Sequence, residues 1–200
     1  MLKMNCTDCP LHIKRTLVVM PTACLPGGLL AIGEAPGADE DIAGEGFVGR
    51  AGKTLDALLL EVGIDRASYG RANICRCRPV DAQGENRKPT AREADACLPK
   101  LAAFIAETKP SVILCVGWTP AKYFFSDKCL GDAIAQSSGR TFIPGQMGLP
   151  SILRGLISPV RVVPMPHTSP LAFNRNAPSG EKWSIVARRQ VALAKGLLLP

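Results

Sequence analysis

Short apolar runs separated by helical patterns restrict the fold of this sequence more than any other feature. Between residues 55 and 62, leucine and valine recur at positions i, i+3, i+4 and i+7, and a second apolar stripe covers residues 94 to 105. Four short runs have the composition of buried strands: 29–32, 72–75, 112–116 and 161–163. Strands that alternate with helices predict an α/β fold, a three-layer α/β/α sandwich around a mainly parallel sheet.

Signals at segment ends place two of the helices and two loops. Thr90 and Glu93 have the spacing of a capping box, so one helix should begin directly after Thr90. A last helix is expected to begin near Glu181 and to run through Trp183 and Val186. The polar, aperiodic segments 80–88 and 126–146 are expected to be loops.

Composition favours one globular domain, residues 1–200, that is soluble and intracellular. The chain has 200 residues, 46% of them hydrophobic, and its apolar stretch at 17–20 is too short to span a bilayer. No membrane association is therefore expected. The net charge of +7 suits a polyanionic partner such as a nucleic acid.

The eight cysteines are better suited to metal ligation than to disulfides, because no export signal is visible. One close pair, Cys6 and Cys9, and single cysteines further along could form a four-sulfur cage for an iron-sulfur cluster or a structural zinc. Cys75 and Cys77 compete for one position, since residues two apart on a strand face the same way. The remaining cysteines have no partner at ligand spacing and are expected to be core or loop thiols: Cys24, Cys115 and Cys129.

Three polar or glycine-rich features follow strands and should meet at the carboxyl edge of the sheet. The Gly33–Gly37 turn follows the first strand, Asn73 lies in or at the end of the second, and His167 follows the last. An asparagine amide offers both a donor and an acceptor to the edge of a base. Phe47 lies in a glycine-rich stretch without periodicity, where an aromatic ring could stack on an extruded base.

The ordered set of motifs resembles the family 4 uracil-DNA glycosylases, base-excision repair enzymes that carry a [4Fe-4S] cluster. The motifs that carry the resemblance are Gly33-Glu34-Ala35-Pro36-Gly37, the acidic run 39–41, Phe47-Val48-Gly49, Cys77-Arg78-Pro79 and His167-Thr168-Ser169-Pro170-Leu171. The resemblance implies a monomeric, monofunctional enzyme that hydrolyses the N-glycosidic bond of deoxyuridine in DNA. Uracil would be released and an abasic site left.

The resemblance also implies roles for individual residues. Phe47 would stack on uracil, Asn73 would read its edge, and Gly33, Glu34 and Ala35 would contact it. Glu34 and His167 would be catalytic, with His167 donating a hydrogen bond to a uracil oxygen. The cluster ligands would be Cys6, Cys9, Cys77 and Cys97, with Cys77 chosen over Cys75 because the family's ligand directly precedes Arg-Pro.

Some features depart from the family pattern or leave a choice. The family usually has His-Pro where this chain has His167-Thr168, which bears on damage specificity. One variant traps the sugar through a histidine in an insert whose counterpart here, 81–89, has none, so turnover is expected. The residue that fills the hole left by the flipped nucleotide is Leu171, Phe173 or Arg175.

Two other functions are compatible with the same sequence. The chain could be a non-catalytic, cluster-bearing DNA-binding protein, or a glycosylase with a shifted preference among deaminated bases. Three arginines near the expected site are candidates for phosphate contacts: Arg50, Arg76 and Arg78.

Overall fold

The computed structural model describes residues 5–198 and contains a five-stranded sheet in the order β2-β1-β3-β5-β4. The first four strands of that order are mutually parallel, and β4 pairs antiparallel with β5. The strands are β1 Leu29–Gly33, β2 Gly70–Asn73, β3 Val112–Val116, β4 Arg140–Phe142 and β5 Val160–Met165. The predicted α/β class and mainly parallel sheet are confirmed.

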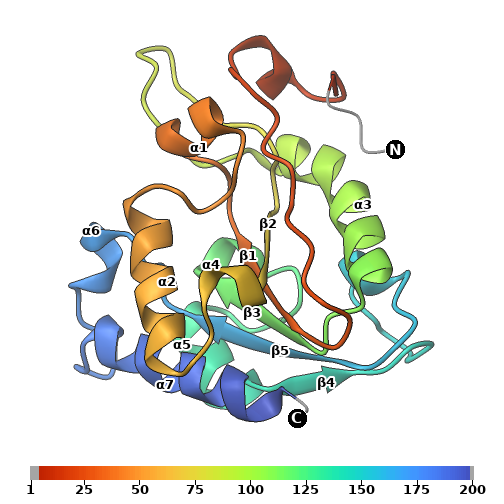
Figure 1. The fold of residues 1–200 in the computed structure, drawn as a ribbon, viewed down its shortest axis with the longest axis vertical. Coiled ribbons are helices and arrows are strands. Elements are labelled where there is room, and N and C mark those ends of the chain that lie inside the picture. The colour runs from red at the N-terminus through yellow and green to blue at the C-terminus, as the bar shows by residue number, and fades with distance from the viewer. Residues whose placement is uncertain (1–4, 199–200) are drawn as a thin grey trace.

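Helices cover both faces of the sheet and complete three layers (Figure 1). Helices α2 (Arg50–Glu61) and α7 (Trp183–Leu197) pack on one face, where their leucines, valines and alanines join one core cluster with alternate residues of β1, β3 and β5. Helix α3 (Ala91–Thr108) packs on the other face within a second cluster. Successive side chains of each strand point to opposite faces of the sheet, so β1, β3 and β5 contribute residues to both core clusters. Strands β1 and β3 are buried along their whole length.

Shorter elements connect these layers. They are the helices α1 Ala38–Ala43, α4 Trp118–Ala121, α5 Leu130–Asp132 and α6 Pro170–Phe173, the 3-10 turns Pro10–Ile13, Arg66–Ser68 and Ser151–Leu153, and the π-helical turn Ala133–Ser137. Within the described residues, no helix is long and apolar enough to cross a membrane.

The capping box predicted for α3 is present. The Glu93 amide donates to Thr90 Oγ1 at 3.3 Å, and the Thr90 amide donates to Glu93 Oε2 at 2.8 Å. Arg87 adds a bidentate ion pair with Glu93, at 2.6 and 2.8 Å, and so fastens the 80–88 loop to the start of α3.

Several predicted boundaries differ from the structure, including the last strand, which covers Val160–Met165 rather than 161–163. Segment 126–146 is not a loop throughout: it contains α5, the π-helical turn and β4, which pattern analysis missed because Phe142 is the one buried residue of that strand. Strand β2 covers Gly70–Asn73 rather than 72–75; its start was missed because the buried Arg71 gives no apolar signal, and it ends at Asn73 before the apolar residues Ile74 and Cys75. Helix α7 begins at Trp183 rather than at Glu181.

Candidate functional site

A pocket of about 550 Å³ opens at the carboxyl edge of the parallel strands. Gly33 ends β1, Asn73 ends β2 and His167 follows β5 by two residues, and all three line this pocket. The structure thus brings together the strand-end features that sequence analysis expected to converge. Its other predicted lining residues are Glu34, Ala35 and Phe47.

Gly33 is enclosed by the two side chains proposed to hold a base. A Cβ added at Gly33 would lie 2.8 Å from Phe47 Cζ and would overlap Asn73 Oδ1. The absence of a side chain at this position therefore allows the ring and the amide to lie next to each other. Within residues 5–198 the Asn73 side-chain amide has no hydrogen-bond partner, so its donor and acceptor remain available to a ligand.

Phe47 is held in an unusual backbone conformation. Its φ angle is +60°, in the left-handed region, which costs a non-glycine residue on the order of 1–3 kcal/mol. Phe47 is 8% exposed as a whole residue, so the loop buries it more than its sequence pattern suggested, although it still lines the pocket. A Cβ at Gly52 would overlap the Phe47 carbonyl, which shows how closely α2 approaches this residue.

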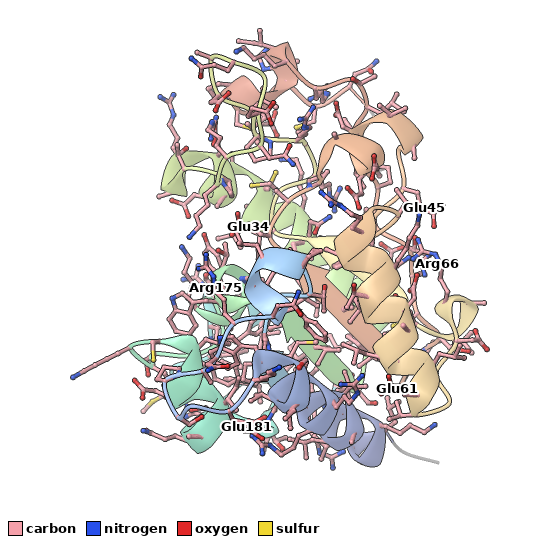
Figure 2. The ribbon with its side chains drawn as sticks, turned by 90° about the vertical axis from the view of Figure 1, so that its left-hand side faces the viewer. Glu34, Glu45, Glu61, Arg66, Arg175 and Glu181 are labelled. Carbon is pink, nitrogen blue, oxygen red and sulfur yellow. The ribbon has the colours of Figure 1, made fainter. Side chains whose placement is uncertain are left out.

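Two carboxylates organise the turn that follows β1. Glu34 lines the pocket and accepts a hydrogen bond from the Thr119 hydroxyl at the start of α4. Figure 2 shows Glu34 beside the short helix α6, whose first residue also lines the pocket. Glu40 accepts from the amides of Gly37 at 3.0 Å and Gly49 at 2.8 Å. Glu40 therefore ties the turn to the loop that follows Phe47.

His167 is oriented as a neutral hydrogen-bond donor. Burial lowers its pKa, and the negative charge of Glu34 opposes this only in part. The Ser169 amide donates to Nδ1 at 3.1 Å, which places the ring proton on Nε2. Gly117, at φ +97°, lies against the ring: a Cβ there would be 3.3 Å from His167 Cδ2. The ring is thus fixed from two sides.

Thr168, which departs from the family pattern, is a structural anchor in this chain. It is fully buried, and its hydroxyl donates to the Ala51 carbonyl in α2 at 2.8 Å. The segment after β5 is therefore fastened to α2. The departure leaves His167 facing the pocket.

The three candidates for the wedge differ in exposure. Leu171, in α6, is 71% exposed and directly follows the pocket-lining residue Pro170. Phe173 instead packs against the core cluster on the α2 and α7 face. Arg175 is exposed, and its carbonyl accepts from the Trp183 amide at 3.0 Å. Of the three, Leu171 alone is both apolar and exposed beside the pocket.

Five cysteines lie close enough for one to shift the pKa of another, at the place where three parts of the chain meet: the N-terminal segment, the residues that follow β2, and helix α3. They are Cys6, Cys9, Cys75, Cys77 and Cys97. Burial raises the pKa of Cys9 and Cys77, and each is also raised by the charge of Cys97. A hydrogen bond from Cys75 lowers the pKa of Cys97 to about 6 and raises that of Cys75. Cys6 contributes to the field at Cys9. The structure thus gathers the four predicted ligands together with their competitor, Cys75.

Basic groups surround these thiols. Arg15 donates to Cys77 Sγ at 3.4 Å and to the Cys6 carbonyl at 2.6 Å. Arg76 is buried and donates to the Lys100 carbonyl at 3.0 Å, so the expectation that it contacts phosphate is wrong. Positive charge beside clustered thiols favours the thiolate form that metal ligation requires.

Among residues 5–198, no three His, Cys, Asp or Glu side chains surround one metal-ion position. The other cysteines are as expected: Cys24 and Cys115 are buried, and Cys129 is exposed.

Sequence reasoning missed several residues that shape the pocket. Asn86 and Arg87 line it from the 80–88 loop, and Thr119 holds Glu34. Arg66 contacts the backbone at Phe47, from a 3-10 turn far along the chain. None of these has a local pattern, although the capping-box Glu93 could have directed attention to the nearby Arg87.

Comparison with known proteins identifies the class that this fold and pocket define. The model of the uracil-DNA glycosylase superfamily matches residues 24–189, and the chain belongs to that superfamily. The match extends from the segment before β1 into α7 and includes the whole pocket.

Individual relatives narrow the comparison. The chain is 39% identical over 146 residues to a type-4 uracil-DNA glycosylase of Thermotoga maritima, covering 70% of this chain and 74% of the relative. It is 37% identical over 123 residues to the enzyme of that name from Archaeoglobus fulgidus, 62% of this chain and 60% of the relative. The type-4 enzyme of Pyrobaculum aerophilum is 41% identical over 118 residues, 59% of this chain and 58% of the relative.

Proposed function

We propose that this protein is a uracil-DNA glycosylase of the type-4 group that releases uracil from deoxyuridine in DNA. The observation that carries the proposal is the Asn73 amide, which has no partner within residues 5–198 and lines the pocket beside Gly33, as the Phe47 ring also does. An aromatic face and an unpaired amide are what a flipped base requires for stacking and for edge recognition. The type-4 relatives carry the name of this activity.

Base recognition follows from the chemistry of the two side chains. Uracil presents N3–H as a donor beside O4 as an acceptor, and the Asn73 amide can pair with both. Phe47 covers one face of the base, and the backbone of Gly33, Glu34 and Ala35 contacts it at the pocket floor. Cytosine reverses this pattern, with an amino donor and an N3 acceptor, so it would match the Asn73 amide only in the orientation rotated by 180°.

The chemical step is hydrolysis of the bond between N1 of uracil and C1′ of the sugar. As that bond breaks, its electron pair moves onto uracil, and the neutral His167 donates Nε2–H to the oxygen where negative charge develops. Glu34 stabilises the cationic sugar and orients the water that adds to C1′. The proton that this water loses is taken up by the uracil anion, so the products are neutral uracil and an abasic site.

Turnover, not trapping, is the expected outcome. Asn86 and Arg87 of the 80–88 loop line the pocket together with the preceding Pro79, and none of the three is a nucleophile toward the sugar. Asn86 is moreover bonded to Arg78, whose Nε donates to Oδ1 of Asn86 at 2.6 Å.

Leu171 is proposed to fill the base stack in place of the extruded nucleotide. Arg50, exposed at the start of α2 and lining the pocket, is the arginine best placed for a phosphate.

A [4Fe-4S] cluster is proposed on Cys6, Cys9, Cys77 and Cys97. Ligation by the four thiolates would join three parts of the chain, namely the N-terminal segment, the residues after β2 and helix α3, and so would have a structural role. Freshly purified protein should then be yellow-brown, with four irons and four inorganic sulfides per chain. One zinc without sulfide would overturn this assignment. The protein is further proposed to act as a monomer and as one domain inside the cell, where its DNA substrate is found.

A strand-cleavage assay tests the activity. Wild-type protein is incubated with a labelled oligonucleotide containing one uracil, and the abasic site is cleaved with alkali. Matched oligonucleotides with thymine, cytosine or hypoxanthine measure specificity. Cleavage at uracil supports the proposal. Binding without cleavage would favour the non-catalytic alternative, and cleavage at hypoxanthine alone would favour a shifted specificity.

A further inference from the structure

Arg66 makes four hydrogen bonds, three of them to the loop containing Phe47 and one to helix α2. Its Nη1 donates to the Phe47 carbonyl at 2.9 Å and to Asp56 Oδ2 at 2.9 Å. Its Nη2 donates to Glu45 Oε1 at 2.7 Å and to the Gly46 carbonyl at 3.0 Å. The four Nη hydrogens are therefore all used inside the protein.

Further contacts hold the partners of Arg66 in place. Tyr69 donates to the second oxygen of Asp56 at 2.5 Å, and Asp56 lies in α2. Arg71 approaches Glu45 at 3.4 Å and donates to the Arg66 carbonyl at 2.7 Å. Figure 2 shows Glu45 and Arg66 close together at one edge of the molecule. The guanidinium thus joins α2 to the Glu45–Phe47 loop within a braced network.

The backbone conformation of Phe47 is one that this hydrogen-bond network can stabilise. Its left-handed φ of +60° is unfavourable for phenylalanine, and such a conformation persists only when the surroundings over-determine it. Arg66 bonds to the Gly46 and Phe47 carbonyls, which belong to the two peptide groups on either side of the Phe47 Cα, and these bonds restrain the backbone of Phe47 directly. Because φ and ψ of Phe47 set the direction of its Cβ, they also decide whether the ring covers the pocket.

We propose that Arg66 is a positioning residue for base stacking, which holds Phe47 in its left-handed conformation so that the ring lies flat against the extruded base. This inference rests on the proposed function and adds a specificity-supporting residue outside the pocket. Arg66 touches neither base nor sugar. It acts through the ring of Phe47, and its contribution should vanish when that ring is absent.

A double-mutant cycle tests this dependence. Single-turnover uracil excision is measured for wild type, Arg66→Gln, Phe47→Ala and the double variant. Arg66→Gln should slow excision about tenfold in the wild-type background, toward the low end of what loss of base stacking costs. In the Phe47→Ala background it should change the rate less than about twofold, because coupled residues are not additive. Inhibition by free uracil should weaken in parallel with the rate.

Arg188→Gln is the matched control. It removes another arginine with two hydrogen bonds to a carboxylate of α2, at 2.9 and 3.3 Å to Glu61, but far from the loop. It should leave excision and uracil inhibition unchanged. If Arg66→Gln does not fold, Arg66→Lys replaces it, since one ammonium keeps the charge but cannot satisfy all four acceptors. All rates are taken below the melting temperatures of the variants.

The outcomes separate this inference from the proposed function. Absence of excision by the wild type would refute the proposed function itself. A wild type that excises uracil together with an Arg66→Gln variant of equal rate would refute the positioning role alone. An equal fall in both backgrounds, with uracil inhibition unchanged, would show that Arg66 is merely structural and would also overturn the inference.

Discussion

Replacement of His167 by alanine is expected to slow uracil excision by roughly a hundredfold to a thousandfold. The structure fixes the ring between the Ser169 amide, 3.1 Å from Nδ1, and Gly117, and burial lowers its pKa, so the neutral ring presents Nε2–H without reorganisation. Loss of one such preorganised donor costs about 3–4 kcal/mol in the transition state. Ground-state affinity should change far less, because the oxygen gains its charge only as the bond breaks.

The assay compares single-turnover excision with equilibrium binding to DNA that contains a non-cleavable 2′-fluorinated deoxyuridine. His167→Gln serves as the matched variant, since its amide can still donate one hydrogen bond and should recover part of the rate. Cluster content and melting temperature are checked for each variant to exclude indirect effects. Near-normal excision by His167→Ala, or an equal loss of rate and affinity, would refute the reasoning and transfer the catalytic role to Glu34.

Other variants probe the pocket and the cysteines. Gly33→Ala should lose most uracil excision with little loss of DNA binding, because the added Cβ would lie 2.8 Å from Phe47 Cζ; wild-type excision would contradict the geometry. Asn73→Asp should lose uracil excision and gain weak cytosine excision, since a carboxylate accepts from the amino group of cytosine; retained uracil activity would remove Asn73 from recognition. Cys77→Ser should lose iron whereas Cys75→Ser should keep it, and the reverse result would exchange the ligand. Stability should fall as pH drops below about 6.5, because the unfolded chain protonates its histidine first while the lowered pKa keeps His167 neutral; a flat melting temperature between pH 7 and 5.5, relative to His167→Gln, would contradict this.

The pocket was predictable from sequence because its parts follow strands. In a parallel sheet the carboxyl ends share one edge, so Gly33, Asn73 and His167 had to approach one another once the strands were found. Strand β4 was missed because Arg140 and Thr141 are exposed, and a three-residue edge strand with one buried side chain has no periodicity to detect.

Contacts that depend on tertiary geometry were beyond pattern analysis. Arg66 lies 19 residues from Phe47, and its role depends on carbonyl oxygens, which every residue possesses. Arg76 was misread for the opposite reason: arginine is usually solvated, yet this one is buried beside the cysteines. Likewise Leu171 could be separated from Phe173 only when the structure showed which of them packs on the core.

The backbone between β1 and β2 connects the two halves of the site. Beyond the strand ends, the Ile74 amide donates to the Gly33 carbonyl at 2.9 Å and the Cys75 amide donates to the Glu34 carbonyl at 3.0 Å. The pocket floor is therefore bonded to the segment that leads into the cysteines, and Asn73 lies at its start. Ligation of Cys77 would restrain that segment from its other end. A bound cluster would thus stabilise the position of the Asn73 amide through these backbone hydrogen bonds. This effect would require no change in the charge of the cluster.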